Sequence, residues 1–92
     1  MEVVLTDRNG YRRLLSDLIV NRHYSIYDIE DAIEDAIEKG GTDSKGTANA
    51  VAEKLNKLPL SVSFYAEKDN GTTMRLHGKD VFGNDRYLII RR

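Results

Sequence analysis

The sequence contains no cysteine and no tryptophan, and it has only one proline among its 92 residues. Without cysteine the chain can form neither a disulfide framework nor a thiolate metal site, and the composition fits a reducing compartment. No apolar run approaches the roughly 20 residues that a membrane-spanning helix needs. The polar turn after Val3-Val4-Leu5 does not resemble a secretory signal. We therefore expect a cytoplasmic protein without a membrane partner.

The length of the chain supports one domain, because 92 residues are too few to form two separate cores. Hydrophobic residues make up 40% of the sequence and charged residues 32%, a balance that is typical of a globular domain and not of a disordered chain. We therefore treat residues 1–92 as a single domain.

Three segments in the first two thirds of the chain show the apolar spacing of amphipathic helices. Near residues 8–21, apolar side chains recur at i, i+3, i+4, i+7 and i+8, which places them on one helical face. A second helix begins at Ser25, where Asp28 completes a shortened capping box, and it ends at the glycine pair after Lys39. A third helix follows and stops at Pro59. Its apolar face comprises Ala48, Val51, Ala52 and Leu55.

From Leu60 onward the apolar period changes to two, which is typical of a half-buried strand. The Asp-Asn-Gly sequence at residues 69–71 predicts a hairpin turn. A three-residue loop, with the glycine in the left-handed region, pairs Ala66 with Met74 and keeps one face of the hairpin apolar. We therefore favour this register over a two-residue loop.

Residues 86–91 form the last predicted strand, with Leu88 and Ile90 directed toward the core. Residues 2–5, with the apolar run Val3-Val4-Leu5, predict a further strand at the edge of the sheet. Because helices must cover the apolar face of such a sheet, the elements together predict a two-layer α+β domain. In this domain three N-terminal helices pack on an antiparallel sheet of three or four strands that ends in a C-terminal β-meander.

The net charge of −1 conceals an uneven distribution of charge along the chain. Residues 25–40, the second predicted helix, carry six acidic side chains and one basic side chain, which gives this segment a charge of −5. The remainder of the chain has a charge of +4. The protein is therefore polarised, and its acidity belongs to one helix.

The acidic helix face allows two interpretations. Like charges four residues apart destabilise an isolated helix by roughly 0.2–0.5 kcal/mol per pair, so an acidic face has a cost that a binding role would explain. The alternative is a solvated face that keeps a small protein in solution. The spacing matches no calcium-binding loop, and we predict no metal site. The candidate partner-binding residues are Glu30, Asp31, Glu34, Asp35 and Glu38.

Two other patterns favour nucleic acid as the partner. On the outward face of the predicted sheet, aromatic and basic side chains alternate as single-stranded nucleic acid requires for stacking and phosphate contacts. The order of the last two predicted helices and the hairpin also resembles a winged helix in outline, with the 69–71 turn as the wing tip. The residues of the sheet face are Tyr65, Arg75, His77, Tyr87 and Arg91, and those at the start of the recognition helix are Ser44, Lys45, Thr47 and Asn49.

Signals of catalysis are weak. The two histidines, His23 and His77, lie far apart in the sequence, and no nucleophile elbow, phosphate-binding loop or dinucleotide glycine pattern occurs. We therefore predict no catalytic residue, no cofactor and no enzymatic activity. The favoured function is a small cytoplasmic binding module that acts as an inhibitor or adaptor on a protein with a basic surface. A phage-type counter-defence inhibitor of a nucleic-acid enzyme is one example, and a nucleic-acid-binding regulator is the alternative.

Overall fold

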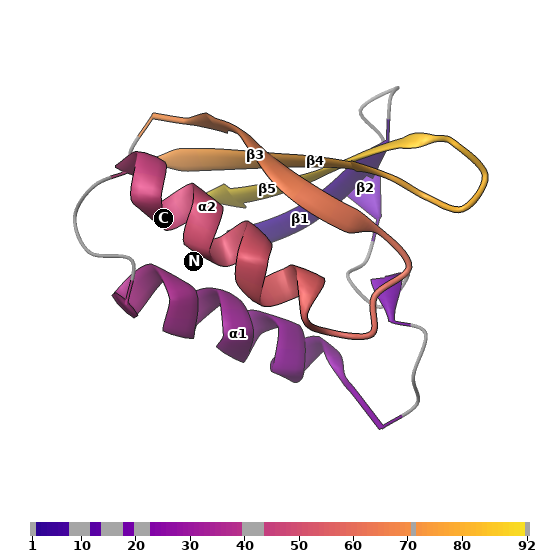
Figure 1. Ribbon diagram of the computed structural model, residues 1–92, viewed down its shortest axis with the longest axis horizontal. Coiled ribbons are helices and arrows are strands. Elements are labelled where there is room, and N and C mark those ends of the chain that lie inside the picture. Colours follow the sequence, from indigo (N-terminus) through magenta and orange to yellow (C-terminus); the bar gives the residue numbers. More distant parts are fainter. Residues whose placement is uncertain are drawn as a thin grey trace.

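The computed structural model describes residues 2–7, 12–13, 18–19, 23–39, 44–70 and 72–91. In this part of the chain, two helices and an antiparallel sheet with four strands of six or seven residues form a small α+β fold (Figure 1). A two-residue strand extends the sheet at one edge. In chain order the elements are β1 (Glu2–Asp7), β2 (Arg12–Arg13), α1 (Ile26–Lys39), α2 (Ser44–Asn56), β3 (Ser63–Asp69), β4 (Thr73–Lys79) and β5 (Asp85–Arg91).

The last strand of the chain lies in the middle of the sheet, whose strand order is β2-β1-β5-β4-β3. Leu88 of β5 pairs with Leu5 of β1 on one side and with Leu76 of β4 on the other. The predicted C-terminal meander is thus confirmed. The N-terminal strand is also present, but β2 pairs with it at Leu5 and Thr6, so only the remaining length of β1 lies at an edge of the described sheet.

The predicted helix over residues 8–21 is wrong where the structure describes this segment. Arg12 and Arg13 form β2, which pairs with β1, and Ile19 makes an antiparallel bridge with Leu60. The apolar spacing that suggested a helix is satisfied in another way, since Leu18 is fully buried. Backbone pairing with other segments of the chain therefore determines the conformation at these positions. The other residues of the predicted helix lie outside the described part of the chain.

The register of the β3–β4 hairpin differs from the predicted one. Ala66 pairs with Leu76 and not with Met74, which pairs with Asp69. Four residues, 70–73, separate the paired residues Asp69 and Met74. Asn70 organises this turn because its Oδ1 accepts hydrogen bonds from the backbone N–H of Thr72 and Thr73, at 3.1 and 2.8 Å. The predicted left-handed Gly71 lies outside the described residues.

A β-bulge in β3 restores the facing of the side chains. The pairing shifts by one residue between Ala66 and Lys68, which leaves Glu67 as the extra residue. The longer turn alone would move every apolar side chain of β3 to the wrong face, and the bulge reverses that displacement. Phe64 therefore remains buried, although the residues of β4 that pair with this part of β3 are shifted by two positions from the predicted ones.

The two helices form where the sequence predicts them. At the start of α1, the carboxylate of Asp28 accepts a hydrogen bond of 2.6 Å from the backbone N–H of Ser25, which is half of a capping box. The predicted apolar face of α2 is buried, with Val51 and Leu55 fully inaccessible to solvent. Apolar periodicity thus indicates both helices, and local capping adds to it at the start of α1.

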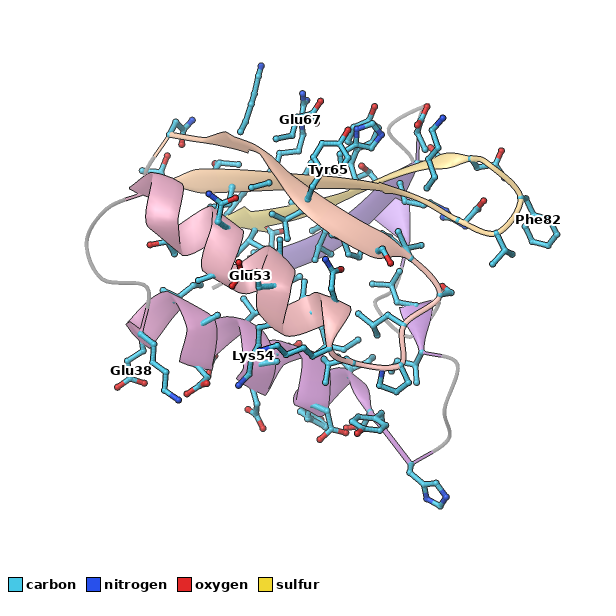
Figure 2. All side chains as sticks on the ribbon, in the orientation of Figure 1. Glu38, Glu53, Lys54, Tyr65, Glu67 and Phe82 are labelled. Atoms are coloured by element: carbon cyan, nitrogen blue, oxygen red, sulfur yellow. The ribbon has the colours of Figure 1, made fainter. Side chains whose placement is uncertain are left out.

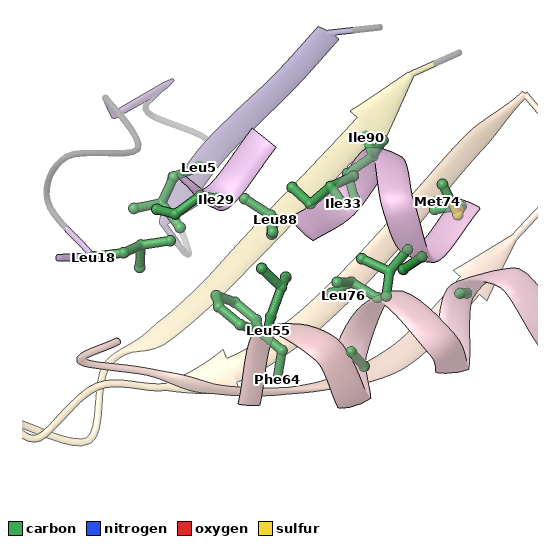
Figure 3. Packing of buried hydrophobic residues seen from close by; sticks show 14 of the residues in the cluster. Leu5, Leu18, Ile29, Ile33, Leu55, Phe64, Met74, Leu76, Leu88 and Ile90 are labelled. Carbon is green, nitrogen blue, oxygen red and sulfur yellow. The ribbon is translucent and has the colours of Figure 1, made fainter. Parts of the chain in front are cut away.

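The core lies between the sheet and the two helices (Figure 3). Leu88 and Ile90 of β5 lie in it with Ile29 and Ile33 of α1, and Leu55 of α2 packs into the same cluster. The largest fully buried apolar side chains are Leu5, Leu18, Ile29, Ile33, Leu55, Met74, Leu76, Leu88 and Ile90. One face of the sheet is therefore covered, and its other face carries the polar and aromatic side chains.

The end of α2 is fixed to β3 by a single side chain. Asn56 donates a hydrogen bond from Nδ2 to the carbonyl oxygen of Phe64, at 2.7 Å, and accepts one at Oδ1 from the N–H of Phe64, at 2.8 Å. These two bonds satisfy both backbone groups of one strand residue. They hold the helix against the strand at the point where the chain turns from one layer into the other.

Candidate functional site

Three of the six acidic side chains of α1 lie with Tyr27 on a ridge, on the side of the helix opposite the core. At 100° per residue, Tyr27, Asp31, Glu34 and Glu38 lie within a sector of about 60°. All four are exposed, and they lie opposite the buried side chains of the same helix. We call these four residues the acidic ridge. Tyr27, with 76% of its surface exposed, stands at its N-terminal end.

Asp35, one of the five predicted binding residues, differs from the residues of the ridge because it is paired with lysines of the same chain. Its Oδ2 lies 3.2 Å from Nζ of Lys54 on α2 and 3.3 Å from Nζ of Lys39. Hydrogen bonds from these two lysines, foremost Lys54, hold the pKa of Asp35 below its ordinary value. This carboxylate connects the two helices, and its charge is neutralised within the molecule.

The other predicted acidic residues keep their charges unbalanced. Glu30 is half-buried, whereas Asp31, Glu34 and Glu38 are exposed. None of these four carboxylates forms an ion pair within the described part of the chain. The structure therefore divides the predicted set into one structural ion pair, at Asp35, and a solvent-facing group of unpaired carboxylates.

The outer face of the sheet brings together the aromatic and basic residues of the alternative prediction. Tyr65, His77 and Tyr87 form a row across three neighbouring strands, because Tyr65 pairs with His77 and His77 pairs with Tyr87. The rings of His77 and Tyr87 stack with centroids 4.5 Å apart. Arg75 lies over the ring of Tyr87, with its Cζ 5.4 Å from the centroid. Four of the five predicted residues therefore lie together on this face.

His77 is held from both sides by polar contacts. Its Nε2 lies 3.0 Å from Oδ1 of Asp85, and its Nδ1 lies 2.6 Å from the hydroxyl of Tyr65. With the proton on Nε2, the ring donates to Asp85 and accepts from Tyr65. The histidine therefore connects β3 and β5 through β4, and the arrangement stabilises the sheet face.

The cations of this face are matched by carboxylates. Arg75 donates to Glu67 at 2.9 Å, and Glu67 is the extra residue of the bulge in β3. Arg91 lies farther along β5, where it contacts Glu2 at 3.3 Å. Phosphate binding would have to compete with these internal pairs. The residue types of the sheet face suit nucleic-acid binding, but the internal ion pairs of its arginines make that binding less favourable.

The residues predicted at the start of a recognition helix do not form one contact surface. Thr47 is fully buried, so its side chain faces the core and not a groove of nucleic acid. Asn49 is exposed on α2. The side chains of Ser44 and Lys45 lie outside the described part of the chain. The recognition-helix prediction thus retains Asn49 as its one described and exposed member.

The sequence predicts a turn at Gly83-Asn84, between the last two strands, but it did not mark this turn as a candidate functional site. Its apolar residues Val81 and Phe82 are 80% and 84% exposed. The Asp80 carboxylate organises the turn, and its Oδ1 accepts hydrogen bonds of 2.9 Å from the backbone N–H of both Phe82 and Asn84. Two apolar residues inside an otherwise polar turn were the available signal.

The turn gives a prediction for acid conditions. The backbone N–H of Asn84, followed by that of Phe82, lowers the pKa of Asp80 from its model-compound value of 3.8. Because the pKa is lowered in the folded state, the carboxylate stabilises the protein above pH ~4, and this contribution is lost as the pH falls through the folded pKa. We expect Asp80→Asn to lower the urea midpoint at pH 7, with a smaller difference from the unmodified chain below the ordinary Asp pKa of 3.8.

A series of urea titrations between neutral and acid pH measures this effect. Asp31→Asn is the control, because it removes an exposed carboxylate that makes no ion pair within the described residues. A gap between Asp80→Asn and the unmodified chain that stays constant from pH 7 to below the unfolded pKa would contradict the assigned role of Asp80.

Comparison of the chain with protein families, with curated proteins and with solved structures found no match. Within the described residues, no helix is long and apolar enough to cross a membrane. No group of three or more side chains in the same part of the chain is arranged to hold a metal ion. The surfaces themselves therefore carry the functional inference.

Proposed function

We propose that this chain is a non-enzymatic cytoplasmic binding module that presents the acidic ridge of α1 to a basic surface of another protein. The observation that carries the proposal is the division of the acidic residues. Asp35 is paired with lysines of its own chain, whereas Asp31, Glu34 and Glu38 face solvent without an ion pair in the described structure. Charges left unpaired along one ridge are available to complementary charges on a partner.

The shape of the ridge supports a protein partner with a basic groove. From Tyr27 to Glu38 the ridge extends over about 17 Å, at 1.5 Å per residue. Tyr27 adds an exposed aromatic ring at one end, and tyrosine is enriched among the residues that dominate binding energy at protein interfaces. A row of carboxylates also competes with nucleic acid for a basic groove. An inhibitor or adaptor, including a phage-type counter-defence protein, suits this charge distribution.

A charge reversal on the ridge tests the proposal. We expect Glu34→Lys with Glu38→Lys to weaken partner binding at least about tenfold, because two attractive contacts become repulsive. Affinity capture from the native host, with nuclease treatment, identifies the partner, and titration of the purified partner gives the dissociation constant at two salt concentrations. Binding should weaken as salt rises, because exposed charges are screened.

Glu53→Lys is the matched control, because it reverses an exposed carboxylate on α2 instead of α1 (Figure 2). Its dissociation constant should stay close to that of the unmodified protein, and circular dichroism should show that each variant is folded. Equal binding by the ridge variant and the unmodified chain would overturn the proposal. Capture that disappears on nuclease treatment would favour the nucleic-acid alternative instead.

A further inference from the structure

The β4–β5 hairpin ends in a protruding apolar tip. Val81 and Phe82 are the most exposed large apolar residues of the described chain, at 80% and 84%. In Figure 2 the ring of Phe82 extends away from the body of the molecule, at the end of the long hairpin. Neither side chain contributes to the core cluster. Folding therefore leaves these two side chains in water.

The tip is ordered although its side chains make no core contacts. Oδ1 of Asp80 accepts from the N–H of Phe82 and of Asn84, both at 2.9 Å, and Arg86 donates to Oδ2 of Asp80 at 3.3 Å. Gly83 adopts a φ of 82°, a conformation that suits glycine. The backbone is thus fixed before any partner arrives, which reduces the entropy lost on binding.

We propose that this tip inserts Phe82, flanked by Val81, into an apolar pocket of a partner protein. The site is separate from the acidic ridge, and its function does not depend on the ridge. A convex protrusion is covered fully only by a concave surface. Aromatic side chains that fill such pockets are the residues that dominate binding energy at protein interfaces.

The charges around the tip favour a protein over a lipid surface. Lys79 and Arg86 are offset by Asp80 and Asp85, so the flanks carry no net positive charge. Anionic membranes attract surfaces with an excess of basic residues, at about 1 kcal/mol per residue. Two apolar side chains without that excess give only marginal membrane attachment.

The small area of the tip favours a different protein over a second copy of this chain. Two such tips in contact would bury roughly 600 Å² in total, from ~150–250 Å² for each phenylalanine and somewhat less for each valine. Stable interfaces bury about 1,200–2,000 Å². A pocket that surrounds the ring removes more of its surface from water than a second convex tip does.

Crosslinking identifies the occupant directly. The intact chain carries p-benzoylphenylalanine at position 81, and it is expressed in its native host with Phe82 intact or with Phe82→Ala. We expect one discrete protein adduct that is lost in the Phe82→Ala chain. The adduct protein is then purified and titrated against the unmodified chain, Phe82→Leu, Phe82→Ala and Tyr65→Ala.

We expect Phe82→Ala to weaken binding about 30-fold or more, with Phe82→Leu retaining most of the affinity. Tyr65→Ala, which removes an exposed aromatic ring on the sheet face, should have little effect. Circular dichroism should show that all variants are folded. Glu34→Lys should leave the Phe82-dependent adduct in place, so the tip and the ridge succeed or fail separately.

Four outcomes would overturn the tip proposal. They are the absence of any protein adduct, an adduct formed only between copies of this chain, and a dissociation constant changed less than threefold by Phe82→Ala. The fourth is Phe82-dependent sedimentation of the chain with vesicles of equimolar phosphatidylcholine and phosphatidylglycerol, which would assign the tip to a lipid surface.

Discussion

Replacing Leu88 with alanine is expected to lower the free energy of unfolding by about 2–5 kcal/mol, which is the range for large-to-small substitutions in a core. Leu88 is fully buried on β5, between Leu5 and Leu76 on the neighbouring strands. The cavity would open at the centre of the sheet, where all sides are packed. Domains of this size are stabilised by about 5–15 kcal/mol in total, so the loss is a large fraction of that stability.

Urea denaturation followed by circular dichroism measures the loss as a lower midpoint at an unchanged slope. Ile89→Ala is the matched control, because it shortens an aliphatic side chain at the next position of the same strand, on the opposite and half-buried face. Its effect should be clearly smaller. If the two substitutions destabilise the protein equally, the assignment of Leu88 to the centre of the core is incorrect.

Gly78→Ala is expected to destabilise the protein by about 1–3 kcal/mol or more, through steric conflict and not through a cavity. A Cβ at position 78 would lie 2.2 Å from the carbonyl oxygen of Ser63 and 2.6 Å from Cγ1 of Val62. The first of these atoms belongs to the backbone of the paired strand, so the conflict is relieved only if β3 and β4 move apart. The hairpin pairing would weaken as a result.

Gly83→Ala separates steric conflict from backbone strain. Gly83 has a positive φ of 82°, but a Cβ there meets no atom within 4 Å. Its substitution should cost only the ~1–2 kcal/mol of a left-handed non-glycine residue. Urea midpoints of both variants give the comparison. A Gly78→Ala protein as stable as the unmodified chain would show that β3 and β4 are not packed as closely as described.

The sequence predicts the elements that depend on local interactions. Both helices of the structure are periodic, and their apolar faces can be read from residues such as Ile33 and Val51. The alternation along β5 likewise predicts that Leu88 and Ile90 are buried. In these segments, the interactions that determine the conformation lie within a few residues of one another.

The predictions fail where the conformation depends on how strands pair with one another. Arg12 and Arg13 form a strand because β1 is there to pair with them, and no local pattern indicates this. The hairpin register depends on the bulge at Glu67 combined with a turn fixed by Asn70. A period-two pattern indicates which face of each strand is apolar, but it does not determine how many residues the connecting turn contains.

The candidate site is divided in the same way. Helical spacing places Glu34 and Glu38 on one ridge, as the sequence predicts. The neutralisation of Asp35 requires Lys54 from the other helix, which only the fold brings within 3.2 Å. The pairing of Arg75 with Glu67 likewise follows from the bulge. The sequence alone thus shows which charged residues are present, whereas the fold determines which of them remain unpaired.

The two hydrogen bonds from Asn56 to Phe64 have a consequence for the behaviour of the protein in concentrated solution. β3 is the last strand of the sheet on its side, and such strands can recruit strands from other molecules and begin aggregation. The backbone groups of Phe64 already bind the Asn56 amide, so an incoming strand must first displace that side chain. The end of α2 therefore hinders the addition of a strand from another molecule at this edge of the sheet.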